Sequence, residues 1–172
     1  MDAAADERSW ATASVRSDVD TADVDIVFRR QSKPVPARHR VTYRTSLLVL
    51  VLSRFNRGAA KLVNLHTVMW ATRTARTRRM FTAWWEGRRF YVTASDRIDP
   101  DLQVTLNLAL VDGLIEPGSR QTRVVLADKG RELARRIDEV EGLLGAEKAF
   151  LTGLTGLSDA AMDRRLRGVV PE

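Results

Sequence analysis

The stretch from residue 99 to residue 130 constrains the fold most, because its capping and turn residues mark the ends of a helix, a β-hairpin and a second helix in close succession. Asp99-Pro100-Asp101 predicts a helix start, since aspartate can cap free backbone N–H groups and proline suits the first helical position. Gly113 predicts the end of this helix. Glu116-Pro117-Gly118-Ser119-Arg120 favours a turn between two short strands, and Asp128-Lys129-Gly130 then opens another helix.

The apolar residues around this turn place the two strands at Leu114-Ile115 and at residues 122–126. Three helices are predicted upstream, over residues 42–57, 59–73 and 76–85, because apolar side chains recur there in steps of three and four. The predicted fold is mainly α, a winged helix-turn-helix-like domain. It consists of three helices, a helix in the recognition position, a two-stranded wing and a closing helix.

One long helix from residue 128 toward residue 151 is expected to close the domain, and Ser158 is expected to cap a last short helix. Apolar residues recur along the long helix at alternating steps of four and three, while Gly142 and Gly145 lower its intrinsic stability. Such a seam can pack on its own domain or on a helix of a partner, and the sequence leaves both possibilities open. Its members are Leu133, Ile137, Val140, Leu144, Leu151 and Leu154.

The first 40 residues differ in composition from the rest of the chain. Residues 1–21 are rich in Ala, Ser, Asp and Thr without an apolar period, and residues 24–28 alternate briefly in the manner of a strand. Two prolines then interrupt a basic segment. We therefore expect a disordered acidic tail and a basic, Pro-containing linker over residues 1–40. One winged-helix domain with a C-terminal helical extension is expected over residues 41–172.

The positive charge is concentrated in one block of the sequence. Residues 1–28 hold seven acids and two bases, residues 29–98 hold two acids and sixteen bases, and residues 99–172 hold thirteen acids and ten bases, within a formal net charge of +6. Because a block of this density repels itself, it indicates an acidic partner, either a phosphate backbone or a carboxylate-rich protein surface. The alternative is that the acidic N-terminal tail neutralises the block.

Composition excludes several classes of chemistry. The chain has no cysteine, which excludes thiolate catalysis, disulfides and cysteine-ligated metals, and it has only two histidines, His39 and His66. Since no phosphate-binding loop, nucleophile elbow or carboxylate pair in a basic pocket occurs, we expect no catalytic, cofactor-binding or metal-binding residue. His66 lies on an apolar helix face and is expected to pack in the core or at an interface. The longest apolar run, residues 47–52, is too short for a membrane span and the N-terminus lacks the basic region of a signal peptide, so a cytoplasmic location is expected.

The helix in the recognition position is poorly suited to reading DNA. It offers Gln103, Thr105 and Asn107 but no cation, and the aspartates at its ends would face phosphate with the wrong sign. Arginines elsewhere suit contact with a phosphate backbone or an acidic protein, and the tryptophans among them suit arginine stacking. The predicted contacts to nucleic acid or an acidic partner are Arg73, Arg76, Arg78, Arg79, Arg88, Arg89, Arg120 and Arg123. The predicted protein-interface residues are Trp84, Trp85, Leu133, Ile137, Val140, Leu144 and Leu151. The alternative is that the tryptophans belong to the core and the arginines form a solvated face.

Five short motifs between residues 42 and 137 are typical of one known family. They are Lys61-Leu62-x-x-Leu65-His66, Met69-Trp70-Ala71 with Arg73, Asp99-Pro100-Asp101-Leu102, Ala109-Leu110-Val111-Asp112-Gly113-Leu114-Ile115, and Val125-Leu126-Ala127-Asp128-Lys129-Gly130. On these motifs the chain resembles the middle component of ABC-three-component systems, small winged-helix-like proteins of bacterial anti-phage and anti-plasmid defence. The chain departs from the general winged-helix pattern at Ala127, where many such domains place a capping threonine.

This resemblance implies a non-catalytic adaptor or scaffold without a cofactor. Its partners would be an SMC/Rad50-like ABC ATPase and an effector protein, with sequence-nonspecific contact to the DNA backbone as a further possibility. The alternative is a MarR- or PadR-like transcriptional regulator that binds a palindrome as a homodimer. That alternative accounts for the wing, the basic charge and the C-terminal seam, but not for a recognition helix without cations.

Overall fold

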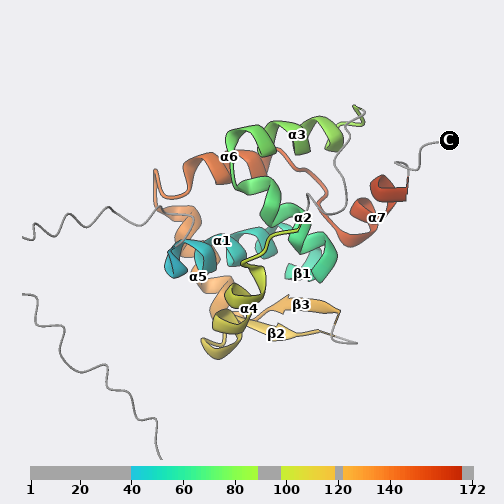
Figure 1. Cartoon of the computed structure of the whole chain (residues 1–172). Coiled ribbons are helices and arrows are strands. Elements are labelled where there is room, and N and C mark those ends of the chain that lie inside the picture. Colours follow the sequence, from blue (N-terminus) through green and yellow to red (C-terminus); the bar gives the residue numbers. More distant parts are fainter. Residues whose placement is uncertain (1–39, 89–97, 119–121, 168–172) are drawn as a thin grey trace, which may run out of the picture. The chain divides into compact units, whose positions relative to one another are not determined.

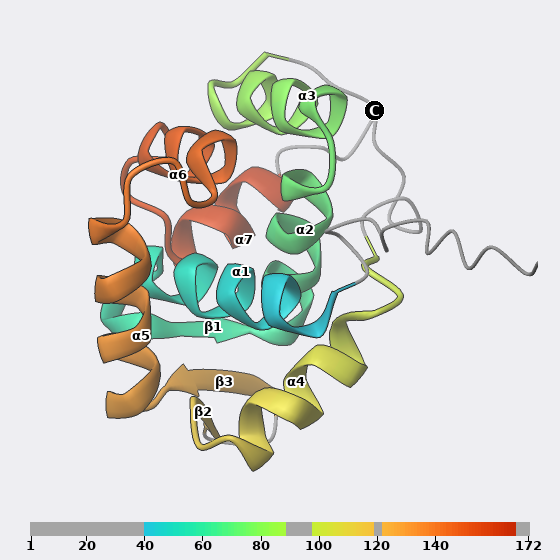
Figure 2. The same ribbon diagram turned by 90° about the vertical axis from the view of Figure 1, so that its left-hand side faces the viewer.

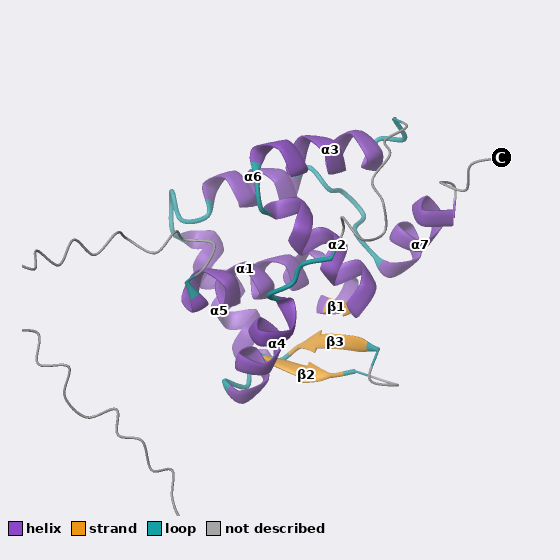
Figure 3. Ribbon diagram, in the orientation of Figure 1, coloured by secondary structure: helices purple, strands orange, loops and turns teal. Residues whose placement is uncertain are grey.

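The computed structural model describes residues 40–88, 98–118 and 122–167 (Figure 1). The tail and linker predicted over residues 1–40, including the strand-like residues 24–28, lie outside the described residues except for Arg40. The described residues are mainly helical and carry a small antiparallel sheet, as predicted from the sequence (Figure 3). In chain order the elements are α1 (Val41–Arg54), the 3-10 turn η2 (Asn56–Gly58), β1 (Ala59–Lys61), α2 (Leu62–Thr72), α3 (Ala75–Trp85), α4 (Leu102–Val111), β2 (Ile115–Pro117), β3 (Arg123–Leu126), α5 (Asp128–Glu139), α6 (Gly145–Thr152) and α7 (Asp159–Arg167).

Helix α1 is the centre of the core. All six side chains from Leu47 to Leu52 are buried, as a helix surrounded by other elements on every side requires. It contacts α2, α4, α5, α6 and the sheet, and Figure 2 shows it between α5 and α2. No side chain caps its N-terminus, so packing rather than capping stabilises this helix.

The sheet has the order β1-β3-β2, with both pairs antiparallel. Its hairpin, β2 and β3, lies where the sequence predicts it. The predicted helix over residues 59–73 is wrong in its first turn, which is strand β1. Three residues carry no strand pattern of their own, and pairing of Ala60 with Val124 determines their conformation. Arg57 and Gly58, with φ of 60° and 65°, turn the chain from α1 into this strand.

Helix α5 approaches the hairpin so closely that only glycine fits at one position. A Cβ on Gly130 would lie 2.1 Å from the carbonyl oxygen of Leu114. That oxygen accepts the backbone N–H of Ala127 at 3.0 Å. Ala127 itself provides no side-chain cap, so the close approach at Gly130, rather than capping, fixes the entry into α5.

The prediction of a single long helix from residue 128 toward residue 151 is wrong, because α5 ends at Glu139 and α6 begins at Gly145. Gly142 has a φ of 75°, and Leu144 takes up a left-handed conformation that buries its side chain. Lys148, on α6, reaches back and donates to the carbonyl oxygens of Asp138 and Val140 at 3.2 and 2.8 Å. The side-chain ammonium thus satisfies free carbonyl groups at the end of α5 and stabilises the break.

Helices α3 and α7 complete the described structure. Thr74 and Thr77 form a reciprocal capping box at the start of α3, and Phe81 of α3 contacts Phe150 of α6 edge-on. Ser158 accepts the backbone N–H of Ala161, which confirms the predicted cap of the last helix. None of the helices in the described ranges combines the length and the apolar character that a bilayer span requires.

Candidate functional site

Helix α4 is anchored at its N-terminal side by a buried ion pair. Arg44, on α1, donates to Asp99 Oδ1 and to Thr105 Oγ1, both at 2.9 Å. The Asp99 side chain is only 1% exposed, and its Oδ1 also accepts the backbone N–H of Asp101. Helix α4 begins at Leu102, two residues after the predicted start at Pro100, and no side chain caps it. Asp99 instead accepts the N–H of Asp101 in the turn before the helix, and it fixes that turn against α1.

His66 ties the same turn to α2. Its Nδ1 accepts the backbone N–H of Asp99 at 3.3 Å, and its side chain is half-buried. This histidine is packed and hydrogen-bonded, in agreement with the prediction from its apolar helix face. The start of α4 is thus held from two sides, by Arg44 of α1 and by His66 of α2.

The outward face of α4 is apolar. Val104, Leu108 and Val111 lie at steps of four and three on one side of the helix, with exposed fractions of 61%, 36% and 86%. The three polar side chains that this helix could offer to DNA bases already have partners within the fold. Thr105 is buried against Arg44, and Gln103 and Asn107 are hydrogen-bonded to each other at 3.0 Å.

A groove of about 170 Å³ lies between the N-terminal part of α1 and α4. Its apolar walls come from both helices, and the guanidinium of Arg44 stays engaged with Asp99 and Thr105. The lining residues are Val41, Arg44, Thr45, Asp101, Val104, Thr105 and Leu108.

The segment that carries α4 is acidic, although two bases from other elements meet it: Arg44 lies 3.5 Å from Asp101, and Lys129 donates to the carbonyl oxygen of Asp112 at 2.7 Å. Residues 98–118 contain four acidic side chains and no Lys, Arg or His. Asp101 at the start of the helix is 46% exposed, and Asp112 at its end is exposed. An anionic, apolar surface repels a phosphate backbone and favours a protein partner.

Some of the arginines predicted to contact a partner are exposed, and others form ion pairs within the fold. Arg73, Arg76 and Arg79 are exposed along α3 and at the end of α2, and take part in no ion pair within the described ranges. Arg88 forms a surface ion pair with Glu86. The remaining predicted contacts are Arg78 and Arg123, which are engaged in the fold, and Arg89 and Arg120, which lie outside the described residues.

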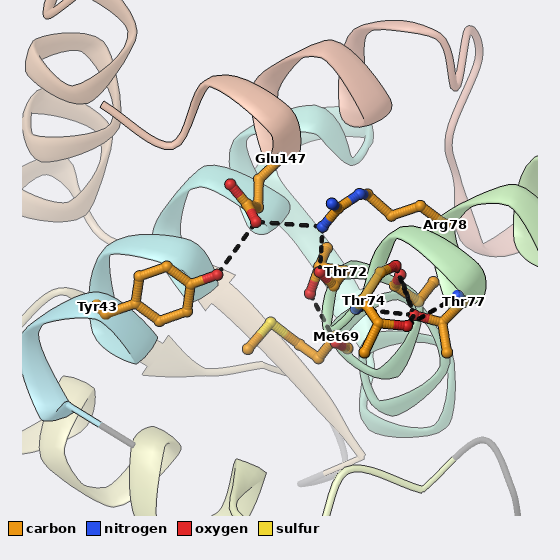
Figure 4. A network of polar contacts seen from close by, with 8 residues as sticks. Tyr43, Met69, Thr72, Thr74, Thr77, Arg78 and Glu147 are labelled. Atoms are coloured by element: carbon orange, nitrogen blue, oxygen red, sulfur yellow. Dashed lines mark hydrogen bonds and ion pairs between the residues drawn. The ribbon is translucent and has the colours of Figure 1, made fainter. Parts of the chain in front are cut away.

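Arg78 belongs to a network that joins four helices (Figure 4). Its Nη1 donates to Glu147 Oε1 at 3.2 Å and to the carbonyl oxygen of Thr72 at 2.8 Å, while the Tyr43 hydroxyl donates to the same Glu147 oxygen at 3.2 Å. Burial, followed by the neighbouring Glu147 carboxylate, raises the pKa of Tyr43 to about 12. The prediction of Arg78 as an external contact is corrected, because its guanidinium holds α1, α2, α3 and α6 together.

Arg123 takes part in a second internal cluster, at the start of α7. Its Nη2 lies 2.8 Å from Asp159 Oδ2, an ion pair outside hydrogen-bond geometry. Asp159 Oδ1 accepts the backbone N–H of Lys61 and the side-chain N–H of Asn64 at 2.9 and 2.8 Å. The predicted contact at Arg123 is therefore corrected in the same way, since this arginine fastens β3 to α7.

Most of the predicted protein-interface residues are core residues. Trp85 is buried, stacks on Phe81 and lies beneath the guanidinium of Arg165 at 3.9 Å, while Trp84 is partly buried beside it. Along the predicted seam Val140 is exposed, and the others pack inward. The correction covers Trp85, Ile137, Leu144 and Leu151, whose side chains are buried within the described fold. Trp84 and Leu133 pack against the core but are only partly buried, and for these two the interface stays a prediction.

Sequence reasoning missed the exposed apolar residues of α4. The signal was present, because this helix has apolar residues on every face: Leu102, Leu106 and Ala109 pack inward while Val104, Leu108 and Val111 point outward. A helix that is apolar all round is either buried or an interface.

No group of three or more His, Asp or Glu side chains that could hold a metal ion occurs among the described residues. No protein-family model, curated protein or solved structure matches this chain.

Proposed function

We propose that this chain is a non-catalytic adaptor, built on a winged-helix plan, that binds a partner protein through the outward face of α4. The winged-helix plan is supported by the order of the elements and by the sheet. Helix α1, strand β1 and helix α2 precede α4 and the hairpin, and β1 pairs with the second hairpin strand, which gives the order β1-β3-β2. In this plan α4 has the recognition position and the β2–β3 hairpin is the wing.

The observation that carries the proposal is the chemistry of α4. A helix that reads the major groove presents hydrogen-bonding and cationic side chains, whereas α4 presents Val104, Leu108 and Val111 between two aspartates. The path between α2 and α4 also differs from a helix-turn-helix, since residues 73–101, with α3, replace a turn of three or four residues. Both features favour protein binding over sequence-specific DNA recognition.

The proposed partners are an SMC/Rad50-like ABC ATPase and an effector protein, in a cytoplasmic complex of bacterial anti-phage or anti-plasmid defence. The motif resemblance supports this assignment, and the apolar face of α4 supplies a surface for one of the partners. Exposed Arg73, Arg76 and Arg79 lie on other elements, α2 and α3, and suit a DNA backbone or a carboxylate-rich surface. An adaptor with separate apolar and cationic surfaces can hold two different components.

Co-expression with the products of the neighbouring genes, followed by size exclusion, tests the proposal. Val104→Asp places a charge on the docking face, and Val63→Asp is the matched control, because Val63 is a 59% exposed helical valine on α2. We expect wild type and Val63→Asp to co-elute with the partner that binds α4, and Val104→Asp to lose that partner, with unchanged circular dichroism. A wild-type chain that elutes alone as a stable homodimer and protects a palindromic DNA site would contradict the adaptor role.

A further inference from the structure

We infer that the α1–α4 groove receives one apolar side chain from a basic amphipathic helix of the partner protein. This inference rests on the proposed function and adds the chemistry of the partner. Three features of the described residues support it: the size of the groove, the ridge that continues from it and the sign of the surrounding charge.

The groove has the size of a single side chain. An engineered apolar cavity of about 150 Å³ accommodates benzene, so about 170 Å³ suits one leucine or phenylalanine side chain. Val41 forms one wall, and Val104 and Leu108 form the other. Because the Arg44 guanidinium already donates to Asp99 and Thr105, it does not demand a polar ligand from the groove.

The ridge beyond the groove indicates a helical partner. Val104, Leu108 and Val111 extend along about 10 Å of α4, which two turns of a facing helix would cover. An extended peptide would instead need a free strand edge. Strand β2, at one edge of the sheet, has only three residues and includes Pro117, which lacks an N–H.

The carboxylates beside the ridge indicate that the partner helix is positively charged. Asp101, with a side chain 46% exposed, and the exposed Asp112 and Glu116 lie beside the ridge. Two bases from other elements lie near them, Arg44 at 3.5 Å from Asp101 and Lys129, which donates to the backbone carbonyl of Asp112, so exposed carboxylates remain in excess. Lys or Arg side chains flanking the apolar positions of the partner helix would meet these carboxylates. A second copy of this chain does not fit, because a symmetric contact through α4 would bring aspartates against aspartates.

Selection from a random library of 16-residue peptides tests the inference with the full-length chain as bait and Val104→Asp as the depletion step. We expect enriched peptides with apolar residues at helical spacing and net positive charge. Synthetic copies should bind the wild type and the Val63→Asp control equally, and bind Val104→Asp at least tenfold more weakly. Asp112→Lys should also weaken binding, and circular dichroism should show that all variants are folded.

Three outcomes would overturn the inference. Enriched peptides that are acidic or extended, yet still depend on Val104, would refute the partner chemistry while leaving docking through α4 intact. Absence of any enrichment that depends on Val104 would contradict docking itself. A wild-type dimer that dissociates on Val104→Asp would assign the ridge to a second copy of the chain.

Discussion

Helices α4 and α5 both pack on α1 (Figure 2), yet the side chains that they present to solvent differ in character. The outward charges of α5 pair with one another: Glu132 accepts from Arg135 Nη2 at 2.7 Å and from Arg136 Nε at 2.8 Å, and Arg135 also pairs with Glu139. The outward side chains of α4 are apolar and lie between aspartates. The outward side chains of α5 are therefore suited to contact with water. Those of α4 leave an apolar patch exposed, which a partner would cover.

The two helices also differ in what holds them in place. Helix α4 depends on a buried polar anchor, Asp99 with Arg44, at one end. Helix α5 depends on steric fit, where Gly130 meets the carbonyl of Leu114. Because the anchors differ in kind, substitutions can disturb one helix without the other.

Removal of the anchor of α4 should have the largest effect. Asp99→Ala leaves the Arg44 guanidinium, which is 11% exposed, without its main carboxylate, and should lower the free energy of unfolding by about 4 kcal/mol. Asp99→Asn, which keeps an acceptor oxygen, should cost less. Urea denaturation checks the order, with Asp112→Ala at the exposed end of α4 as the control that should change stability by less than about 0.5 kcal/mol. Equal stability of Asp99→Ala and the control would show that the pair does not anchor α4.

Overpacking the anchor of α5 should have the next largest effect. Gly130→Ala forces α5 away from the hairpin and should lower the free energy of unfolding by about 3 kcal/mol. The matched control is Gly145→Ala at the start of α6, where a Cβ meets nothing within 4 Å. Thermal denaturation should show a large loss for the first variant and none for the second. Similar melting temperatures would contradict the close approach.

The network that joins α1 to α6 should make stability depend on alkaline pH. The pKa of Tyr43 is raised in the folded state, so the neutral phenol contributes stability that is present below pH 10 and is lost as pH rises toward 12. We expect wild type to lose more stability than Tyr43→Phe between pH 9 and pH 11, in urea titrations at each pH. Parallel losses in the two proteins would place the tyrosine outside the network.

Removal of the surface ion pairs of α5 should have the smallest effect on stability, because such pairs are screened by water and salt. Hydrogen bonds from Arg135 and Arg136 lower the pKa of Glu132 to about 2, so its stabilising contribution is present above pH 4 to 5 and is lost as pH falls toward 2. Glu132→Gln should be nearly neutral at pH 7 and should show a weaker acid dependence than wild type. Binding of the partner should not change, and a loss of binding would place part of the interface on α5.

Sequence reasoning succeeds where local chemistry decides the structure. The hairpin and the cap at Ser158 follow from turn and capping residues, and the start of α4 is predicted to within two residues. It fails where distant contacts decide. Strand β1 exists because it pairs with β3, and the break before α6 depends on Lys148 reaching back to the end of α5.

The same distinction holds for the candidate site. A run of arginines does not reveal which members have an internal carboxylate, and Arg78 and Arg123 find Glu147 and Asp159, which are far away in the sequence. The seam of the C-terminal region could face inward or outward, and only the packing of Ile137 and Leu151 decides that it faces the core. The exposed apolar residues of α4 could be predicted from the sequence. Only one face of a short helix packs on the core, so apolar side chains on its other faces must be exposed or bind a partner.

Hydrogen exchange of the purified complex with its co-expressed partner tests the central claim most directly. If α4 is the docking face, amide exchange over residues 102–111 and at the start of α1 should slow on complex formation, while exchange over residues 128–139 of α5 should stay unchanged. Slowed exchange in α5 with no change in α4 would contradict the account. So would protection of α4 by duplex DNA in the absence of a partner.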